Sequence, residues 1–277
     1  MTVLCALPPG DTATLPRAAE PLARALGLSL AATALFDAAA SADPANPADV
    51  EAARAAAEAD LAALLPPGVA SAGLSLRLNG EPPWSPPVRL AIATAPRLLA
   101  VDARETPWLG DLGRAVRAAP VPVLAIGPRY AGPAPTPVRI LALADGSPES
   151  AAVAPALARL LGDAAVPVEL LAVAVPAVGE RPEERELDLA AALQALERGL
   201  SAPAAHRRVE PPRAFESVPA AALRVAAETG ATHLALATHG RGRAMRFLLG
   251  SVAEALLRTS PLPLIVTAPG GTDAAGR

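Results

Sequence analysis

The chain has 277 residues, which is more than one average domain, so we expect two domains. It is 52% hydrophobic with a mean hydropathy of +0.35, yet it contains no apolar run near the roughly 20 residues that cross a membrane. The net charge of −3 excludes a general field for nucleic acid or anionic membranes, and the single cysteine excludes an internal disulfide. We therefore expect a soluble, cytoplasmic protein with no membrane or nucleic-acid partner.

The first half of the chain alternates apolar runs with helical patterns. Its expected strands are 2–8, 28–36, 74–78 and 121–126. One helix is expected after the first strand, with Leu15, Ala18, Ala19 and Leu22 on one face, and another begins at an Asn46 cap followed by Pro47. This order is typical of an α/β domain.

A proline- and glycine-rich segment, residues 127–137, separates the two halves. It reads GPRYAGPAPTP, and its four prolines and two glycines favour an extended, non-helical connection. The sequence thus predicts one domain over residues 1–128 and a second over residues 138–270.

The second half repeats the alternation more clearly. The expected strands are 140–145, 166–175, 206–210, 232–238 and 261–268, and the expected helices are 147–162, 182–199, 218–230 and 250–259. Alternating strands and helices indicate a parallel, doubly wound sheet.

The ends of the two halves match each other. GDLGRAVRAAPVPVLAI, residues 110–126, parallels GSVAEALLRTSPLPLIV, residues 250–266, which places Pro120 and Pro122 opposite Pro261 and Pro263. Because proline lacks an N–H group, we expect the last strand of each half to be an edge strand. The match indicates a duplication.

RILALADGSPES, VELLAV and ATHGRGRAMRFLLGS together resemble the universal stress protein family of the tandem type. The resemblance implies two tandem doubly wound, mostly parallel five-stranded sheets with helices on both faces, related by a pseudo-twofold. It also implies that the last strands, Val121 to Ile126 and Leu262 to Thr267, lie together, so that one chain mimics a dimer. A sheet ending in an apolar strand has an exposed edge, which favours this pairing.

The family's phosphate-binding signature is glycine, two residues, glycine, nine residues, glycine, then serine or threonine. In this sequence those positions are Ala237, Gly240, Gly250 and Ser251, so the first glycine is replaced. Helix-start N–H groups have no intrahelical partner and attract anions, so Gly250 and Ser251 can hold a phosphate. Gly240 allows a close approach, and Arg241, or Arg243 or Arg246, can screen the charge. An ordinary helix cap beside a solvated loop is the alternative interpretation.

Two further positions carry roles that the resemblance implies. Asp145 follows a strand and is expected to accept hydrogen bonds from the ribose hydroxyls of an adenine nucleotide, although DGSPES is also a good helix-start sequence. The backbone of Val173 is expected to contact adenine, and its side chain is equally compatible with the core. The expected ligand is ATP or AMP, with or without Mg²⁺.

Other chemistries fit the sequence less well. All 24 basic residues are arginine, which excludes lysine-based phosphate loops and Schiff bases. Gly240 and Gly242 begin a GxGxxG pattern, but its third position is Met245, which disfavours a dinucleotide dehydrogenase. His233 and His239 have no nucleophile or metal-ligand spacing, and Cys5 fits a buried strand.

The first half lacks the residues that form the expected nucleotide site in the second half. Pro8 stands where Asp145 would fall, and Gly110 and Asp111 stand where Gly250 and Ser251 would fall, so a carboxylate would repel phosphate. We therefore expect a degenerate first domain and one nucleotide site per chain.

The leading hypothesis is a stress-response regulator that binds ATP or AMP in its second domain and works through a protein partner not identified by the sequence. No general base is visible, so a binding role is expected rather than catalysis, while slow ATP hydrolysis and further homodimer formation stay open. The alternative is a nucleotide-free interaction scaffold of the same fold, which Ala237 favours.

Overall fold

The computed structural model describes residues 1–8, 11–43, 45–78, 80–104, 108–133, 136–200, 206–238 and 249–268. The first half contains β1 (Thr2–Leu7), α1 (Thr14–Ala25), β2 (Ser29–Asp37), α2 (Ala38–Ser41), α3 (Pro47–Leu64), β3 (Val69–Arg77), α4 (Ser85–Thr94), β4 (Leu98–Asp102), α5 (Trp108–Ala118) and β5 (Val123–Ile126). The second half contains β6 (Ile140–Leu143), the 3₁₀ turn η1 (Ser150–Ala152), α6 (Val153–Leu161), β7 (Val168–Val173), α7 (Pro182–Glu197), β8 (Arg207–Glu210), α8 (Val218–Thr229), β9 (His233–Ala237), α9 (Ser251–Thr259) and β10 (Leu264–Thr267).

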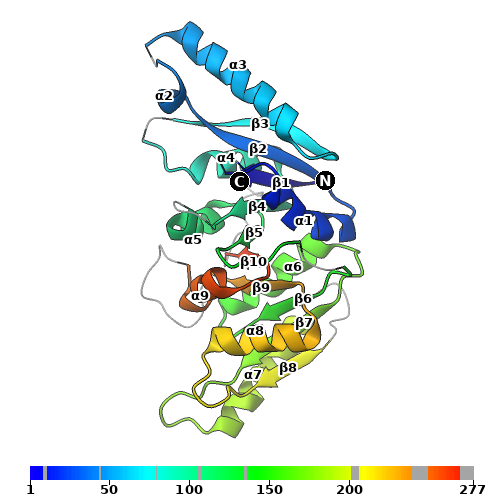
Figure 1. Ribbon diagram of the computed structural model, residues 1–277. Helices are drawn as coiled ribbons and strands as arrows, with labels where there is room; N and C mark the ends of the chain where they lie inside the picture. Colours follow the sequence, from blue (N-terminus) through cyan, green and yellow to red (C-terminus); the bar gives the residue numbers. More distant parts are fainter. Residues whose placement is uncertain are drawn as a thin grey trace.

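Within these residues, all strands belong to one sheet with the order β3-β2-β1-β4-β5-β10-β9-β6-β7-β8 (Figure 1). Neighbouring strands within each half are parallel, as alternation with helices requires. The predicted α/β fold with two mostly parallel five-stranded halves is confirmed.

The two halves meet at β5 and β10, which pair antiparallel. Leu264 lies opposite Ala125, Ile265 opposite Leu124, and Val266 opposite Val123. The predicted pairing of the last strands across an internal pseudo-twofold is therefore confirmed, and we call this β5–β10 junction the seam. Because β5 and β10 run in opposite directions, the two halves point their carboxyl strand ends in opposite directions.

The expectation that the last strand of each half is an edge strand is confirmed for each half taken alone. Each is the last strand of its own half, but both lie in the interior, and the sheet edges are β3 and β8. The prolines do not prevent this, because Pro122 and Pro263 directly precede the first strand residues. Their carbonyl oxygens accept hydrogen bonds from the N–H groups of Leu99 and Leu234 in the neighbouring strands.

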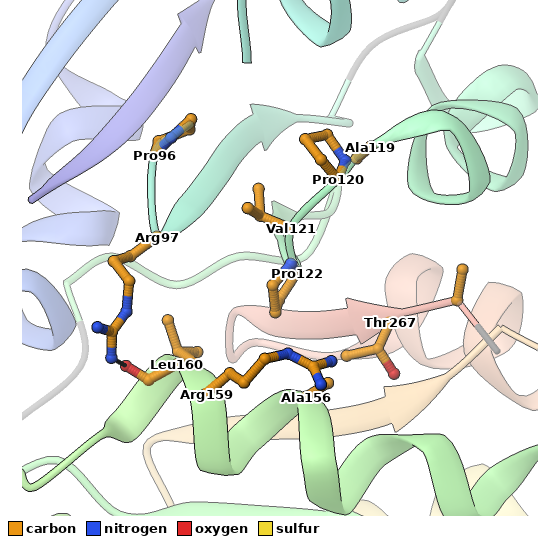
Figure 2. Close-up of a pocket in the computed structure, with 11 residues that line it drawn as sticks. Pro96, Arg97, Ala119, Pro120, Val121, Pro122, Ala156, Arg159, Leu160 and Thr267 are labelled. Atoms are coloured by element: carbon orange, nitrogen blue, oxygen red, sulfur yellow. Dashed lines mark hydrogen bonds between the residues drawn. The ribbon is translucent and has the colours of Figure 1, made fainter. Parts of the chain in front are cut away.

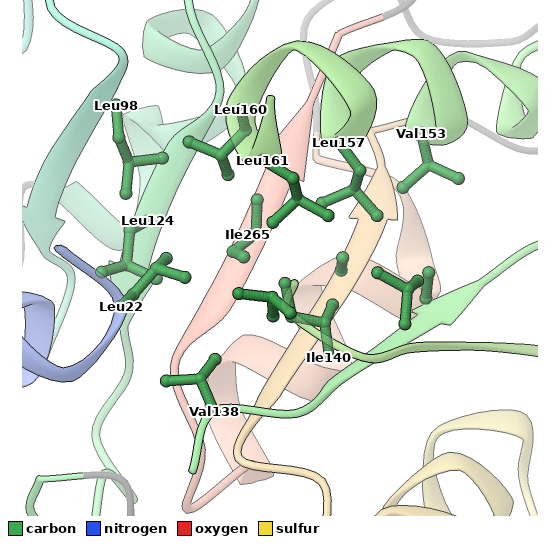
Figure 3. Packing of buried hydrophobic residues seen from close by; sticks show 14 of the residues in the cluster. Leu22, Leu98, Leu124, Val138, Ile140, Val153, Leu157, Leu160, Leu161 and Ile265 are labelled. Atoms are coloured by element: carbon green, nitrogen blue, oxygen red, sulfur yellow. The ribbon is translucent and has the colours of Figure 1, made fainter. Parts of the chain in front are cut away.

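Helices cover both faces of the sheet. One apolar cluster packs α1, α6 and α7 on one face, and the other packs α4, α5, α8 and α9 on the opposite face. The first cluster crosses the seam, since Leu22 and Leu124 of the first half share it with Leu157 and Ile265 of the second (Figure 3). The two halves are thus joined by a continuous core as well as by strand pairing.

Local sequence sets the helix limits that were expected. The Asn46 side chain accepts a hydrogen bond from the Ala48 N–H at 3.1 Å and caps α3, and Pro47 follows it. Gly230 ends α8 in a left-handed conformation with φ of 67°. The domain limits 1–128 and 138–270 stay a prediction.

Candidate functional site

The strand order reverses between the neighbouring strands β6 and β9. The chain runs outward from β6 to β7 and β8, and then returns to place β9 on the other side of β6. In doubly wound sheets, ligands bind at the carboxyl ends of the strands where the order reverses in this way. The carboxyl ends of β6 and β9 are therefore the candidate site, and we call this position the β6–β9 crevice.

Asp145 lies at this crevice, two residues after β6 ends, and is half-buried. Its Oδ1 accepts a hydrogen bond from the Ser147 N–H at 2.9 Å, and its own N–H donates to the Ser150 Oγ at 3.4 Å. These are the turn contacts that the helix-start interpretation predicts. They fix the carboxylate at the rim, and a carboxylate with two oxygens can accept several hydrogen bonds at once.

Arg185 was missed by the sequence analysis. It lies in α7, is 4% exposed, and donates from Nη2 to the carbonyl oxygen of Asp145 at 2.9 Å. Its place four residues before Leu189, on the buried face of α7, was the available signal. Arg185 thus braces the loop that carries Asp145.

Val173 and Ala237 end the two strands that flank β6. Val173 is the last residue of β7 and is 8% exposed, and its carbonyl oxygen accepts from the Val175 N–H at 3.0 Å. Ala237 is the last residue of β9 and is 9% exposed. Since β9, β6 and β7 are neighbours and parallel, these two residues and Asp145 share one edge of the sheet.

The start of α9 is tied to the end of β9. The Gly250 N–H donates to the carbonyl oxygen of Thr238 at 2.6 Å. This hydrogen bond places the start of α9 directly beside the end of β9. Gly250 is the N-cap of α9 and supplies no side-chain cap, while Ser251 is exposed. The first N–H groups of α9 have no intrahelical acceptors, and a helix start of this kind can bind anions.

Gly240 and Arg241, together with Gly242, Arg243, Met245 and Arg246, fall within residues 239–248 and lie outside the described residues. The structure thus brings together Asp145, Val173, Ala237, Gly250 and Ser251, and the roles of all seven predicted site residues stay predictions.

The titratable residues considered for chemistry lie elsewhere. His233 is fully buried at the amino end of β9, roughly 13 Å of strand away from Ala237. Burial lowers its pKa to about 4, and its Nδ1 contacts the Thr232 hydroxyl at 2.9 Å. Burial also raises the pKa of Cys5 to about 12, so the thiol stays protonated in the core. In the described part of the chain, no group of three or more His, Cys, Asp or Glu residues could hold a metal.

The corresponding crevice of the first half lies between β1 and β4. The two halves can be aligned by matching Pro122 with Pro263, which sets β5 on β10, and then following the strand registers outward. In this alignment Asp102 corresponds to Ala237, and Pro8 corresponds to Asp145. The two crevices therefore differ in the residues that form their rims.

An ion cluster occupies the rim of the first-half crevice. Arg104 Nη2 lies 2.6 Å from both Asp102 Oδ2 and Asp11 Oδ2. The hydrogen bonds that Arg104 donates to Asp102 and Asp11 raise the pKa of Arg104, although burial opposes this. Burial would raise the pKa of Asp11, but hydrogen bonds from Thr14 and Arg104 hold it well below its usual range. The first-half crevice thus contains its own cation and two carboxylates.

Asp111, the other first-half difference, lies in the first turn of α5. Its Oδ1 accepts from Arg114 Nη1 at 3.2 Å. A carboxylate therefore lies in the first turn of α5, the first-half helix that corresponds to α9.

Comparisons with known proteins follow the same division of the chain. The sequence profile of the universal stress protein family matches residues 138–268. No curated protein matches the chain. None of the helices in the described residues combines the length and the hydropathy of a membrane-spanning segment.

Two solved structures are similar over nearly the whole chain. A universal stress protein from Archaeoglobus fulgidus DSM 4304 is 17% identical with a TM-score of 0.58, covering 96% of this chain and 98% of that one. A functionally unknown protein from Pseudomonas aeruginosa PAO1 is 16% identical with a TM-score of 0.56, covering 97% of this chain and 92% of that one. At such identities the likeness shows a shared fold.

Proposed function

Residues 138–268 belong to the universal stress protein family and the first half repeats their fold, so we propose that the second half binds an adenine nucleotide, ATP or AMP. The chain then acts as a nucleotide-dependent regulator in a stress response. The observation that carries the proposal is that Asp145 and the uncapped start of α9 lie at the same crevice.

The groups at the crevice match the parts of a nucleotide. The Asp145 carboxylate accepts hydrogen bonds from the vicinal ribose hydroxyls. The phosphates accept from the first N–H groups of α9 and from the Ser251 hydroxyl, with Gly240 and Arg241 as further contacts. The Val173 backbone contacts adenine.

Ala237 is the feature that favours the alternative, a nucleotide-free scaffold. Its methyl group stands at the crevice rim, at a position that is glycine in the family signature. A methyl group there narrows the space for ribose, which weakens binding but leaves the phosphate contacts intact. Native mass spectrometry of the purified protein separates the two functions: a co-purified adenine nucleotide supports the binding role, and a nucleotide-free protein that also fails to take up ATP supports the scaffold.

A charge placed at the start of α9 tests the phosphate contacts. Gly250→Glu puts a carboxylate where the phosphates bind, and two like charges about 4 Å apart repel by about 1 kcal/mol in water and several times more in a partly buried site. We expect labelled ATP to bind at least tenfold more weakly, with an unchanged circular dichroism spectrum.

Thr259→Glu is the matched control, because Thr259 is exposed at the other end of the same helix, roughly 13 Å away. It should bind ATP like the original chain. Equal affinities of the two variants would show that the start of α9 does not contact phosphate.

A further inference from the structure

A cavity of about 160 Å³ lies at one end of the seam (Figure 2). Thr267 in its wall lies opposite Ala237 of β9, so the cavity adjoins the β6–β9 crevice but shares none of the residues assigned to it. Because β5 and β10 are antiparallel, the segment before β5, Pro120 to Pro122, lies beside the carboxyl end of β10 at Thr267. α6 and the segment before β4 complete the walls. We call this cavity the seam pocket. Both halves of the chain line it, and it is smaller than the roughly 300 Å³ of pockets that hold drug-sized ligands.

The polar side chains of the seam pocket are Arg97, Arg159 and Thr267. Among the described residues that line it there is no acidic residue, and neither arginine forms an ion pair in the described part of the chain. In Figure 2 the Arg159 side chain extends along α6 toward Thr267, while Arg97 approaches α6 from the first half. Both arginines thus line the cavity, with the Arg97 guanidinium beside the Leu160 carbonyl and the Arg159 guanidinium toward Thr267.

Two of these side chains carry buried donors without an acceptor. Arg97 donates from Nη2 to the carbonyl oxygen of Leu160 at 2.9 Å, across the seam, but its buried Nε has no partner among the described residues. Thr267 is 3% exposed, and its hydroxyl likewise has no partner there. A buried donor without an acceptor destabilises a fold, so an unexplained pair of them at one pocket points to a ligand that accepts hydrogen bonds.

The pseudo-twofold provides an internal comparison. The strand registers give Thr232 as the counterpart of Arg97 and Ile126 as the counterpart of Thr267. The match between the buried positions of α1 and α6 gives Pro21 as the counterpart of Arg159. The prolines beside the seam occur in both halves, whereas none of the three counterpart residues is charged and Ile126 has no hydroxyl. Packing of the seam therefore does not require these polar groups.

We propose that the seam pocket binds a small phosphate-class oxyanion. The two arginine charges match the charge of about −2 that a phosphate group carries near pH 7, and guanidinium N–H groups fit its oxygens. The Thr267 hydroxyl donates to a further oxygen. The anion is held by Arg97 of the first half and by Arg159 and Thr267 of the second, so it bridges the seam.

Titration with inorganic phosphate at constant ionic strength tests the proposal, with binding followed by calorimetry and by the melting temperature. We expect saturable binding that raises the melting temperature. Arg159→Gln should weaken it at least tenfold and Thr267→Val several-fold. Thr267→Val keeps the shape and removes the unpaired hydroxyl, so without phosphate it should melt no lower than the original chain.

Two controls separate this pocket from other phosphate contacts. Arg17→Gln removes an exposed arginine of α1 and should leave phosphate affinity unchanged. Gly250→Glu disturbs the proposed nucleotide site and should also leave it unchanged. The proposal is overturned if phosphate does not bind at millimolar concentration, if Arg159→Gln binds it as well as the original chain, or if Gly250→Glu abolishes binding.

Discussion

Replacing Gly127 with alanine should destabilise the junction between the two halves. Gly127 directly follows β5, and a Cβ atom built there lies 1.7 Å from the carbonyl oxygen and 2.8 Å from the carbonyl carbon of Leu257 in α9. Both are backbone atoms of the other half, so no side-chain rotation relieves the contact. The two backbones must move apart by about 1 Å or more, in a region packed at crystal-like density.

The cost can be estimated from overpacked cores, where added atoms destabilise by about 1–3 kcal/mol. Because the clash is with backbone, we expect the upper end, about 3 kcal/mol, which lowers the melting temperature of a chain this long by about 6–12 °C. Urea unfolding and calorimetry measure both quantities.

Gly199→Ala is the matched control for this prediction. A Cβ atom at Gly199 lies 3.3 Å from the Leu196 carbonyl oxygen and 3.5 Å from the Ala154 Cβ, which needs only a small adjustment. The control should change the free energy of unfolding by less than about 1 kcal/mol. If Gly127→Ala is as stable as the original chain, the close approach of β5 and α9 is not as described.

Three other measurements check separate features. Burial lowers the pKa of His233 from 6.5 to about 4, so this side chain binds a proton more tightly in the unfolded chain than in the folded one. The free energy of unfolding should therefore fall by up to about 3 kcal/mol as the pH drops from 6.5 to 4. In urea titrations, His233→Leu should lose most of this pH dependence. Asn46→Ala removes the cap of α3 and should cost about 1 kcal/mol in thermal unfolding. Calorimetry at saturating ATP should give one nucleotide per chain, weakened by Asp145→Ala, and two similar sites would contradict the interpretation of the first half as degenerate.

Local patterns were sufficient to predict the elements of the fold. Helices were placed by spaced leucines and by caps such as Asn46, and the apolar runs became the strands. The pairing of β5 with β10 was also predictable, because an apolar last strand needs a partner. That pairing also implies that both strands become interior strands of one sheet, as the structure shows.

The site could be predicted where it depends on strand ends and could not where it depends on long-range contacts. Asp145 follows a strand and Gly250 precedes a helix whose limits the sequence indicates, so their positions beside β6 and α9 could be predicted. Arg104 and Asp11 are 93 positions apart and meet only because β1 and β4 are neighbours. Their ion cluster therefore became visible only in the folded chain, as did the contact of Arg185 with Asp145.

Joining the halves in one chain has a consequence for the seam. Association of two separate subunits weakens on dilution, whereas a short connection keeps the partners at an effective concentration in the millimolar range. The segment 127–139 thus makes β5–β10 pairing independent of protein concentration. A symmetric homodimer would also repeat every substitution on both sides of its axis. Covalent linkage removes that constraint, so one half can retain Asp145 at its crevice while the other replaces it with the Arg104 ion cluster.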